Sequence, residues 1–430
     1  MAKQSTQNDT AWEALFEKYD ILDNIAKNGK YIISAEQIKE YREPRLMAKF
    51  DHSINLPHIF SANSLAILPI SRGSYVLSHF EAYKSFKTQK ENATKVSLPN
   101  HIQSLNPNKV TSEAIALNCA LAAGMLEDFL EEESLVSTVS GRMGSGTFDF
   151  KINNTRLMSA SLVQVDGSQI EIDAAVEGIH CLALLEAKRD LSEDFLIRQL
   201  YYPYRVWETQ VTKTVRPVFL IYSNGIYRFY EYAFQDLTHY NSLELVRYKS
   251  YTIEDTAIKE SELLDLIAQV NPLAQEPSIS FPQADNFERV INICELLQSK
   301  TLSRDEVTEK YAFDARQTNY YTDAARYLGL TEKARDPLDS NKVKYRLSAR
   351  GAKIMALPYK QRQLALCACI LEHKVFFEVF VRATNNTMPD KNTIIQLMMQ
   401  ANIYKVEAEA TYERRASTIS GWIHWMLQLI

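Results

Sequence analysis

Three charged side chains stand inside two apolar segments in the middle of the sequence. Asp173 lies in IEIDAAVEG (170–178), and Glu186 and Lys188 lie in CLALLEAKRD (181–190). Burying a charge costs several kcal/mol unless the charge is paired or bound to a metal, so these positions need an explanation. One explanation is structural, a salt bridge at the edge of a strand. The other is functional, a site in which two carboxylates and an ammonium act together.

The spacing of Glu186 and Lys188 favours the functional explanation. Successive side chains of a strand point to opposite faces, so these two share a face while Ala187 points into the core. If the strand with Asp173 pairs with theirs, all three charges meet at one end of the sheet. Carboxylates held so closely raise each other's pKa, and a divalent cation relieves the repulsion. Oxygen ligands that leave room for water and a phosphate suit Mg²⁺.

Such a site has the parts that phosphodiester hydrolysis needs. The cation can polarise the phosphate and acidify a bound water. Lys188 can orient the resulting hydroxide and offset the charge that builds up on phosphorus. The sequence therefore predicts a Mg²⁺-dependent hydrolase with Asp173, Glu186 and Lys188 as its catalytic residues.

The flanking sequence predicts the elements that position these residues. One helix is expected at 111–133 and a second at 192–210, with Ser192 as the N-cap of the second. Apolar strand segments lie between the two helices, and two further strands follow, joined by the hairpin signal Asn224-Gly225. This alternation of helices and strands indicates a mixed α/β layer fold.

The residues around the three charges resemble a known nuclease superfamily. Asp173 followed by Glu186-Ala187-Lys188 is similar to the motif of the PD-(D/E)xK nucleases, although Ile172 stands where the motif usually has a proline. The resemblance covers roughly residues 108–255. It implies that Asp173 and Glu186 bind Mg²⁺, that the Ala187 carbonyl adds a ligand, and that Lys188 assists the attacking water.

Two further residues enter the site through this resemblance. Gln199, in RQLYYPYR with Tyr202 and Tyr204, is similar to the Gln/Tyr-bearing helix beside the active site of several such nucleases. It is expected to contact the site residues or the substrate. Glu113 is a candidate for a further metal-binding acid, and its alternative role is that of a first-turn residue favoured by the helix dipole. The tyrosines are expected to pack in the core.

The C-terminal part carries a local excess of positive charge. From Phe281 onward, 21 Lys and Arg stand against 17 Asp and Glu, whereas the whole chain carries −5. A capping box, Ser303 with Glu306, and a cap at Asp314 begin two of three predicted helices, and a two-stranded wing follows them. Three helices and a wing are typical of a winged helix-turn-helix, and a basic unit on an acidic body permits a local DNA-binding surface.

Two kinds of DNA contact are expected from this unit. The third helix is expected to read bases near its start, where Arg suits guanine and Gln or Asn suits adenine, and the wing is expected to lie over the phosphate backbone. A solvated basic face is the alternative explanation for the wing. Base contacts are expected from Arg316, Gln317, Asn319 and Tyr320, phosphate contacts from Lys342, Lys344, Arg346 and Arg350, and further DNA contacts from Arg42, Arg45 and Arg142.

These observations divide the chain into five parts. The fold class expected is α/β, a restriction-endonuclease-like mixed sheet core with an N-terminal α+β region and a C-terminal winged-helix and helical region. The parts are an N-terminal α+β region at 1–105, the nuclease core at 106–270, a linker at 271–284, a winged helix-turn-helix at 285–358, and a helical module at 359–430, for which a second winged helix is the alternative.

The function favoured is that of a Mg²⁺-dependent, sequence-specific endonuclease for double-stranded DNA, similar to type II restriction enzymes. Cutting both strands takes two active sites, so a homodimer is expected. The alternatives are a repair or modification-dependent nuclease with the same core and a non-catalytic winged-helix regulator. Intact Asp173, Glu186 and Lys188 argue against the regulator. A cytoplasmic protein is expected, because no apolar run of about 18 residues and no apolar signal core are found.

Overall fold

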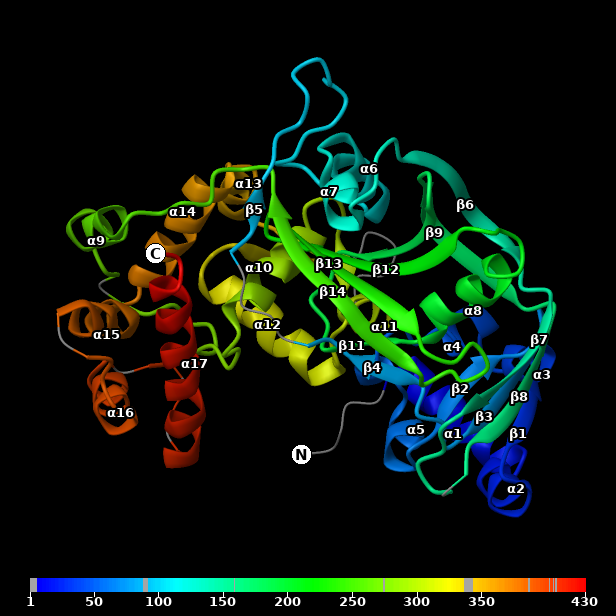
Figure 1. Cartoon of the computed structure of the whole chain (residues 1–430). Coiled ribbons are helices and arrows are strands. Elements are labelled where there is room, and N and C mark those ends of the chain that lie inside the picture. The colour runs from blue at the N-terminus through cyan, green and yellow to red at the C-terminus, as the bar shows by residue number, and fades with distance from the viewer. Residues whose placement is uncertain are drawn as a thin grey trace.

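The structure is a computed structural model that describes the chain except for residues 1–5, 88–91, 158, 274, 336–342, 386, 402, 405 and 407. A central unit built on a mixed sheet (residues 79–255) stands between an N-terminal unit (residues 6–78) and a helical C-terminal unit (residues 260–430), as Figure 1 shows. The predicted mixed α/β architecture is confirmed.

The central sheet brings the two segments with the charged residues side by side. β9 (Gln169–Glu177) pairs antiparallel with β10 (Cys181–Lys188). β10 runs parallel to β12 (Thr214–Ser223), and the connection between them contains the helix α8 (Arg198–Trp207). The seven strands lie in the order β5 (Thr94–Lys95), β14 (Leu243–Thr252), β13 (Ile226–Phe234), β12, β10, β9 and β6 (Val136–Gly144).

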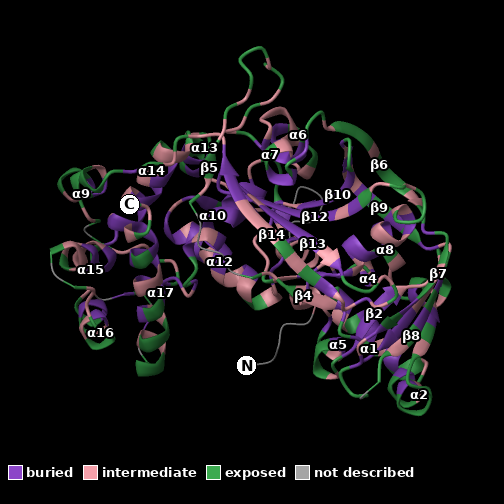
Figure 2. Cartoon of the chain, in the orientation of Figure 1, coloured by how far each residue is buried: buried purple, intermediate pink, exposed green. Residues whose placement is uncertain are grey.

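Helices cover both faces of this sheet, and the strands are buried between them (Figure 2). On one face α6 (Glu113–Ala122) and α7 (Met125–Leu130) pack against a cluster that includes Ala187. On the other face α8 packs against a second cluster that includes Phe219. Because neighbouring residues of β10 alternate, Glu186 and Lys188 point away from α6 and towards the side of α8.

Two predicted helices differ from the observed ones. The helix expected at 111–133 is divided at Gly124, whose φ of 70° is left-handed and interrupts the helical backbone. The helix expected from Ser192 begins only at Arg198, because 194–196 form the strand β11 (Asp194–Leu196), which pairs with β4 (Tyr83–Ser85). Ser192 is therefore not the N-cap of this helix. The hairpin Asn224-Gly225 is confirmed, with both residues at positive φ.

The N-terminal unit is α+β, as expected, but it ends near residue 78 and not at 105, because β4 pairs with β11 and β5 pairs with β14 of the central unit. Its three-stranded sheet has one side against the unit's own helices, with Trp12, Phe16 and Phe60 packed edge to face. The other side joins the cluster under α8, together with the hairpin β7 (Thr147–Ile152) and β8 (Ser161–Asp166). The elements are α1 (Gln7–Lys18), α2 (Ile21–Asn28), β1 (Tyr31–Ser34), α3 (Ala35–Lys39), α4 (Pro44–Met47), a 3₁₀ turn (Ser53–Asn55), α5 (His58–Ala62), β2 (Ala66–Pro69) and β3 (Ser74–Ser78).

The C-terminal unit contains the predicted three helices and hairpin. The caps at Ser303 and Asp314 are confirmed. A short additional strand gives the small sheet the order β15-β17-β16. The elements are α10 (Phe287–Leu296), β15 (Leu302–Ser303), α11 (Arg304–Lys310), α12 (Ala315–Tyr327), β16 (Thr331–Arg335), β17 (Val343–Leu347), α13 (Ala349–Met355), α14 (Tyr359–Leu371), α15 (Lys374–Asn385), α16 (Lys391–Gln400) and α17 (Glu409–Leu427).

The expected organisation of the C-terminal part needs three corrections. Helix α9 (Glu260–Gln269) was expected in the nuclease core, but Leu263 and Leu266 are buried in the C-terminal cluster. The expected linker at 271–284 is packed there too, since Phe281 is buried between Tyr327 and Phe376. Among the described residues of 359–430 the structure has helices and no strand, so the possible second winged helix is not found.

The C-terminal unit is fixed to the central sheet by buried hydrogen bonds at the β12–β13 turn. The main-chain N–H of Asn224 donates to Glu295 Oε1 at 2.7 Å, and its side-chain Oδ1 accepts from Gln363 at 2.7 Å. Ser223 donates to the other oxygen of Glu295. Within the described residues, no helix combines the length and apolar character needed to cross a membrane.

Candidate active site

The register of β9 and β10 brings Asp173 to Glu186. Leu185 pairs with Ala174 and Leu184 with Ala175, so the next positions along the two strands face each other where the pairing ends. There the Asp173 carboxylate accepts a hydrogen bond from the main-chain N–H of Ala187 at 2.9 Å. The side chain thus replaces the strand partner that this N–H would otherwise have.

Glu186 is the centre of the site. Its Oε1 accepts from Lys188 Nζ at 2.6 Å and from Gln199 Nε2 at 2.5 Å, and the residue is only 8% exposed. Gln199 lies in the first turn of α8, the helix that connects β10 to β12. This helix therefore holds the Glu186 carboxylate on the face of the sheet that the helix covers. The structure therefore brings together Asp173, Glu186, Lys188 and Gln199, all four catalytic residues predicted from the sequence.

The electrostatics of this group follow from burial and mutual repulsion. Burial raises the pKa of Glu186 to about 7, with Asp173 and Asp51 adding to the rise and Lys188 opposing it. Burial disfavours the Lys188 ammonium, but the carboxylates of Glu186, Asp51 and Asp173 outweigh it and raise the pKa of Lys188 well above its ordinary value. Lys188 is therefore a fixed positive charge, whereas Glu186 takes up and releases a proton near neutral pH.

A fourth charged residue, Asp51, comes from the N-terminal unit and was not predicted. Its Oδ2 lies 3.3 Å from Lys188 Nζ. Burial opposes its ionisation, but the positive charges of Lys188 and Lys49 prevail and hold the pKa of Asp51 well below its ordinary value. The local sequence, AKFDHS, has no pattern that marks a site residue, because this contact exists only through the docking of two units.

These residues line a cavity of about 660 Å³ to which all three units contribute. Asp173, Glu186, Ala187, Lys188 and Gln199 line it from the central unit, with Asp51 from the N-terminal unit. Tyr311 borders it from the loop after α11. The cavity also has a cationic lining, formed by Arg45, Lys49, Arg72, Arg142, Arg198 and Lys310. A cavity that combines buried carboxylates with several cations suits an anionic substrate bound beside a metal ion.

The cavity offers the carboxylates of Asp173 and Glu186 to a metal ion. Within the described part of the chain, no group of three or more His, Cys, Asp or Glu side chains is arranged to hold a metal ion. Mg²⁺ does not need such a cage, because it commonly keeps several waters and takes one or two carboxylates plus a substrate phosphate. Asp173 and Glu186 provide two carboxylates, and the described contacts of Glu186 all fall on Oε1. The donor set therefore fits a hydrated Mg²⁺.

Glu113 also lines the cavity, as its candidate role requires. It is the first residue of α6, where Ser112 caps the helix through the N–H of Ile115. Both expectations for this residue, a further acid at the site and a first-turn acid, are therefore compatible with its position. Tyr201 and Tyr202 are fully buried and donate to main-chain carbonyls, as expected for core residues.

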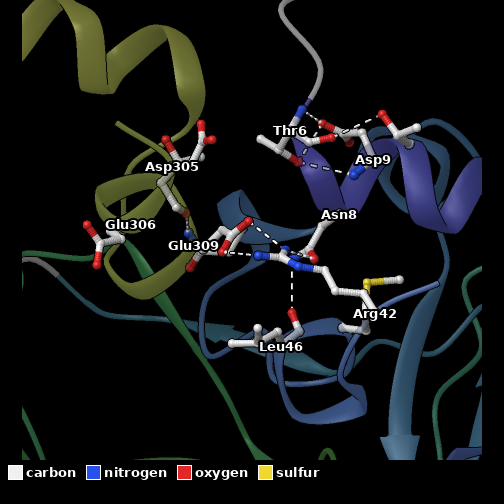
Figure 3. Close-up of polar contacts among 12 residues, drawn as sticks. Thr6, Asn8, Asp9, Arg42, Leu46, Asp305, Glu306 and Glu309 are labelled. Atoms are coloured by element: carbon white, nitrogen blue, oxygen red, sulfur yellow. Dashed lines mark hydrogen bonds and ion pairs between the residues drawn. The ribbon is translucent and has the colours of Figure 1, made fainter. Parts of the chain in front are cut away.

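The predicted DNA contacts in the N-terminal and central units divide into two groups. Arg45 and Arg142 line the cavity, the latter with a neighbour, Glu171, at 3.3 Å. Arg42 instead makes a bidentate ion pair with Glu309 of α11, at 2.7 and 3.0 Å, and also donates a hydrogen bond to Asn8 (Figure 3). Arg42 therefore joins the N-terminal unit to the C-terminal unit, and its charge is already compensated.

The predicted contacts of the C-terminal unit lie on three elements. Arg316, Gln317, Asn319 and Tyr320 fall in the first half of α12, and the exposed Arg316 donates to the hydroxyl of Tyr320. Lys344 and Arg346 lie on β17, where Arg346 pairs with Glu332. Arg350, on α13, pairs with Glu372 through both of its terminal nitrogens. Lys342 lies outside the described residues. Arg346 and Arg350, both predicted to contact phosphates, thus have acidic partners on neighbouring elements.

Three family models match the chain, and each describes a domain of unknown function. DUF6996 matches residues 9–77, DUF6997 matches 78–252 and DUF7226 matches 289–430. No curated protein and no solved structure matches the chain. The three matched ranges correspond closely to the three units, and all four residues predicted to be catalytic fall within the second of them.

Proposed function

We propose that this chain is a Mg²⁺-dependent endonuclease that hydrolyses double-stranded DNA, similar to type II restriction enzymes with a PD-(D/E)xK core. One observation carries the proposal. Asp173, Glu186 and Lys188 meet at the end of two neighbouring strands, in a cavity lined by cations from all three units. A phosphodiester is the substrate class that such a combination suits, because its charge is attracted by the cations and its hydrolysis uses the carboxylates and the lysine.

In the proposed reaction Asp173, Glu186 and the Ala187 carbonyl would hold Mg²⁺, which would supply polarisation of the phosphate and acidification of a water. Lys188 orients the attacking oxygen and offsets the negative charge that develops on phosphorus. The attacking water loses a proton to solvent, the new bond joins its oxygen to phosphorus, the bond from phosphorus to one sugar oxygen breaks, and the leaving oxygen takes a proton from water. Gln199 keeps the Glu186 carboxylate in one orientation through the 2.5 Å hydrogen bond.

The C-terminal unit is proposed to bind and read the duplex as a winged helix-turn-helix. The order of α10, α11, α12 and the β16–β17 hairpin supports this assignment, with the start of α12 against base edges and the hairpin over the phosphates. The end of α11 borders the cavity through Lys310, so DNA held by this unit would lie next to the cutting site. A homodimer on DNA would supply the second active site for the other strand.

The test is digestion of plasmid DNA by the purified full chain with Mg²⁺. Matched unmethylated and methylated plasmids are used, and Lys188→Ala is the inactive control. Discrete fragments from unmethylated DNA support a restriction enzyme, and cutting that depends on methylation supports the modification-dependent alternative. Tight DNA binding without any cutting would contradict the nuclease proposal and favour the regulator.

A further inference from the structure

We propose that Asp51 positions the Lys188 ammonium, so that the active site is complete only when the N-terminal unit is docked on the central unit. This inference rests on the proposed nuclease function and extends it. The N-terminal unit, which a separate family model matches, would then support the chemistry by positioning Lys188, in addition to any contact that it makes with DNA.

The first step is that Lys188 is held from two sides. On its own strand, Glu186 lies two residues away on the same face and contacts Nζ at 2.6 Å. From the facing unit, Asp51 Oδ2 contacts the same atom at 3.3 Å. A lysine side chain has a long flexible stem and keeps much rotamer freedom, so a single partner at its own strand leaves its tip poorly defined. The second carboxylate fixes where the ammonium stands in the cavity.

The second step is that Asp51 is itself firmly placed. Its main-chain carbonyl accepts from the N–H of Leu196 at 2.9 Å. The next residue, His52, is buried and contacts the Asp194 carbonyl at 2.6 Å and Asp190 at 3.2 Å. The loop that carries Asp51 is therefore attached to β11 and to the chain just beyond β10.

The third step separates positioning from simple docking. The main chain of Asp51, the ring of His52 and the N–H of Ser53, which donates to Asp194 at 3.0 Å, already attach this loop. The Asp51 carboxylate is not used for that attachment. Its closest ion pair is with Lys188, and its other oxygen, Oδ1, is buried without a hydrogen-bond partner among the described residues. Removing the charge of Asp51 should therefore affect Lys188 while leaving these attachments of the loop in place.

The position of Lys188 also explains why docking matters. The three residues 188–190, at and just beyond the end of β10, contact all three units. Lys188 contacts Asp51 of the N-terminal unit. Arg189 donates to the Thr111 carbonyl of the central unit at 2.7 Å, and Asp190 accepts from the main-chain N–H of Ala312 of the C-terminal unit at 2.8 Å. The proposed catalytic lysine is thus the first residue of the joint between the units. Displacement of the N-terminal unit would remove one of its two anchors.

The experiment compares Asp51→Asn, which keeps the shape and removes the charge, with Asp194→Asn as the matched control. Asp194 holds the same loop through Ser53 and is not in contact with Lys188. Single-turnover cleavage after addition of Mg²⁺ to pre-bound DNA is measured beside duplex affinity in Ca²⁺. Asp51→Asn is expected to slow cleavage by about 10- to 100-fold, the range found when a residue that orients a group at a metal site is lost, with affinity unchanged or tighter. Asp51→Glu is expected to retain more activity than Asp51→Asn.

A second readout measures Lys188 itself. Acetylation of Lys188 by acetic anhydride, quantified by peptide mass spectrometry, is expected to rise in Asp51→Asn and to stay at the wild-type level in Asp194→Asn. Equal cleavage and equal acetylation in Asp51→Asn and the wild type would overturn the inference while leaving the nuclease proposal intact. Equal losses in the two variants would also overturn it, since the loop alone would then matter. If the wild type does not cut DNA, the nuclease proposal fails, and the acetylation result alone decides whether Asp51 positions Lys188.

Discussion

Replacing Glu186 with Gln is expected to stabilise the metal-free protein at alkaline pH. The pKa of Glu186 is raised from 4.5 to about 7 by burial and by the neighbouring carboxylates. As the pH rises from 4.5 to 7, the unfolded chain releases this proton before the folded chain does, so folding stability falls across that window and the penalty is complete above it. At about 1.36 kcal/mol per pKa unit, the folded wild type is penalised by about 3 kcal/mol at pH 8.

Gln at this position stays neutral and can still accept from Lys188 and Gln199, so the penalty should be absent from the variant. The assay is thermal unfolding of both proteins in EDTA at pH 5 and pH 8. For a cooperative unit of about 150–250 residues, each kcal/mol shifts Tm by about 2–4 °C, so Glu186→Gln should melt roughly 6–12 °C above the wild type at pH 8. At pH 5 most of the difference should vanish. A variant no more stable than the wild type at pH 8, or an advantage independent of pH, would refute the reasoning.

Four further outcomes are expected. Mg²⁺ should raise the Tm of the wild type more than that of Glu186→Gln, because a ligand stabilises only the form that binds it; equal shifts would place the metal elsewhere. Ca²⁺ should support DNA binding without cutting, since its looser coordination positions water poorly, and efficient cleavage in EDTA would exclude the metal mechanism. Arg346→Ala should weaken binding to all DNA and reduce the salt dependence by about one unit. Arg316→Ala should weaken binding by roughly 1–3 kcal/mol at the cognate site only. Equal losses of affinity on cognate and scrambled duplexes would show that α12 binds DNA without contributing to sequence recognition.

The parts of the site that were predicted depend on local patterns. Glu186 and Lys188 share a face because strand geometry alternates, and Ala187 is buried on the opposite side. Gln199 was found by resemblance, and its contact with Glu186 follows from the helix that joins the two parallel strands. The Asn224-Gly225 turn and the caps at Ser303 and Asp314 were likewise predictable from the sequence, because each depends on the residues beside it.

The parts that were missed depend on contacts between segments far apart in the sequence. Asp51 reaches Lys188 only because the loop after α4 docks on β11. The pairing of β11 with β4 is also a contact between distant segments, and because of it α8 begins at Arg198 and not at Ser192. The ion pair between Arg42, which is predicted to contact DNA, and Glu309 on α11 was likewise not visible in the sequence. In each case the observed contact or helix start depends on a distant segment of the chain, which the neighbouring residues in the sequence do not reveal.

The most direct test of the central claim is Mg²⁺-initiated cleavage of a bound duplex by Asp173→Ala, Glu186→Ala and Lys188→Ala. Each variant should fold and bind DNA in Ca²⁺, and each should lose cleavage. Loss of either carboxylate should also weaken binding of Mn²⁺, used as a spectroscopic stand-in for Mg²⁺, whereas loss of the lysine should not. Near-normal cutting by any one of the three variants would contradict the assignment of this site as the place where the phosphodiester is hydrolysed.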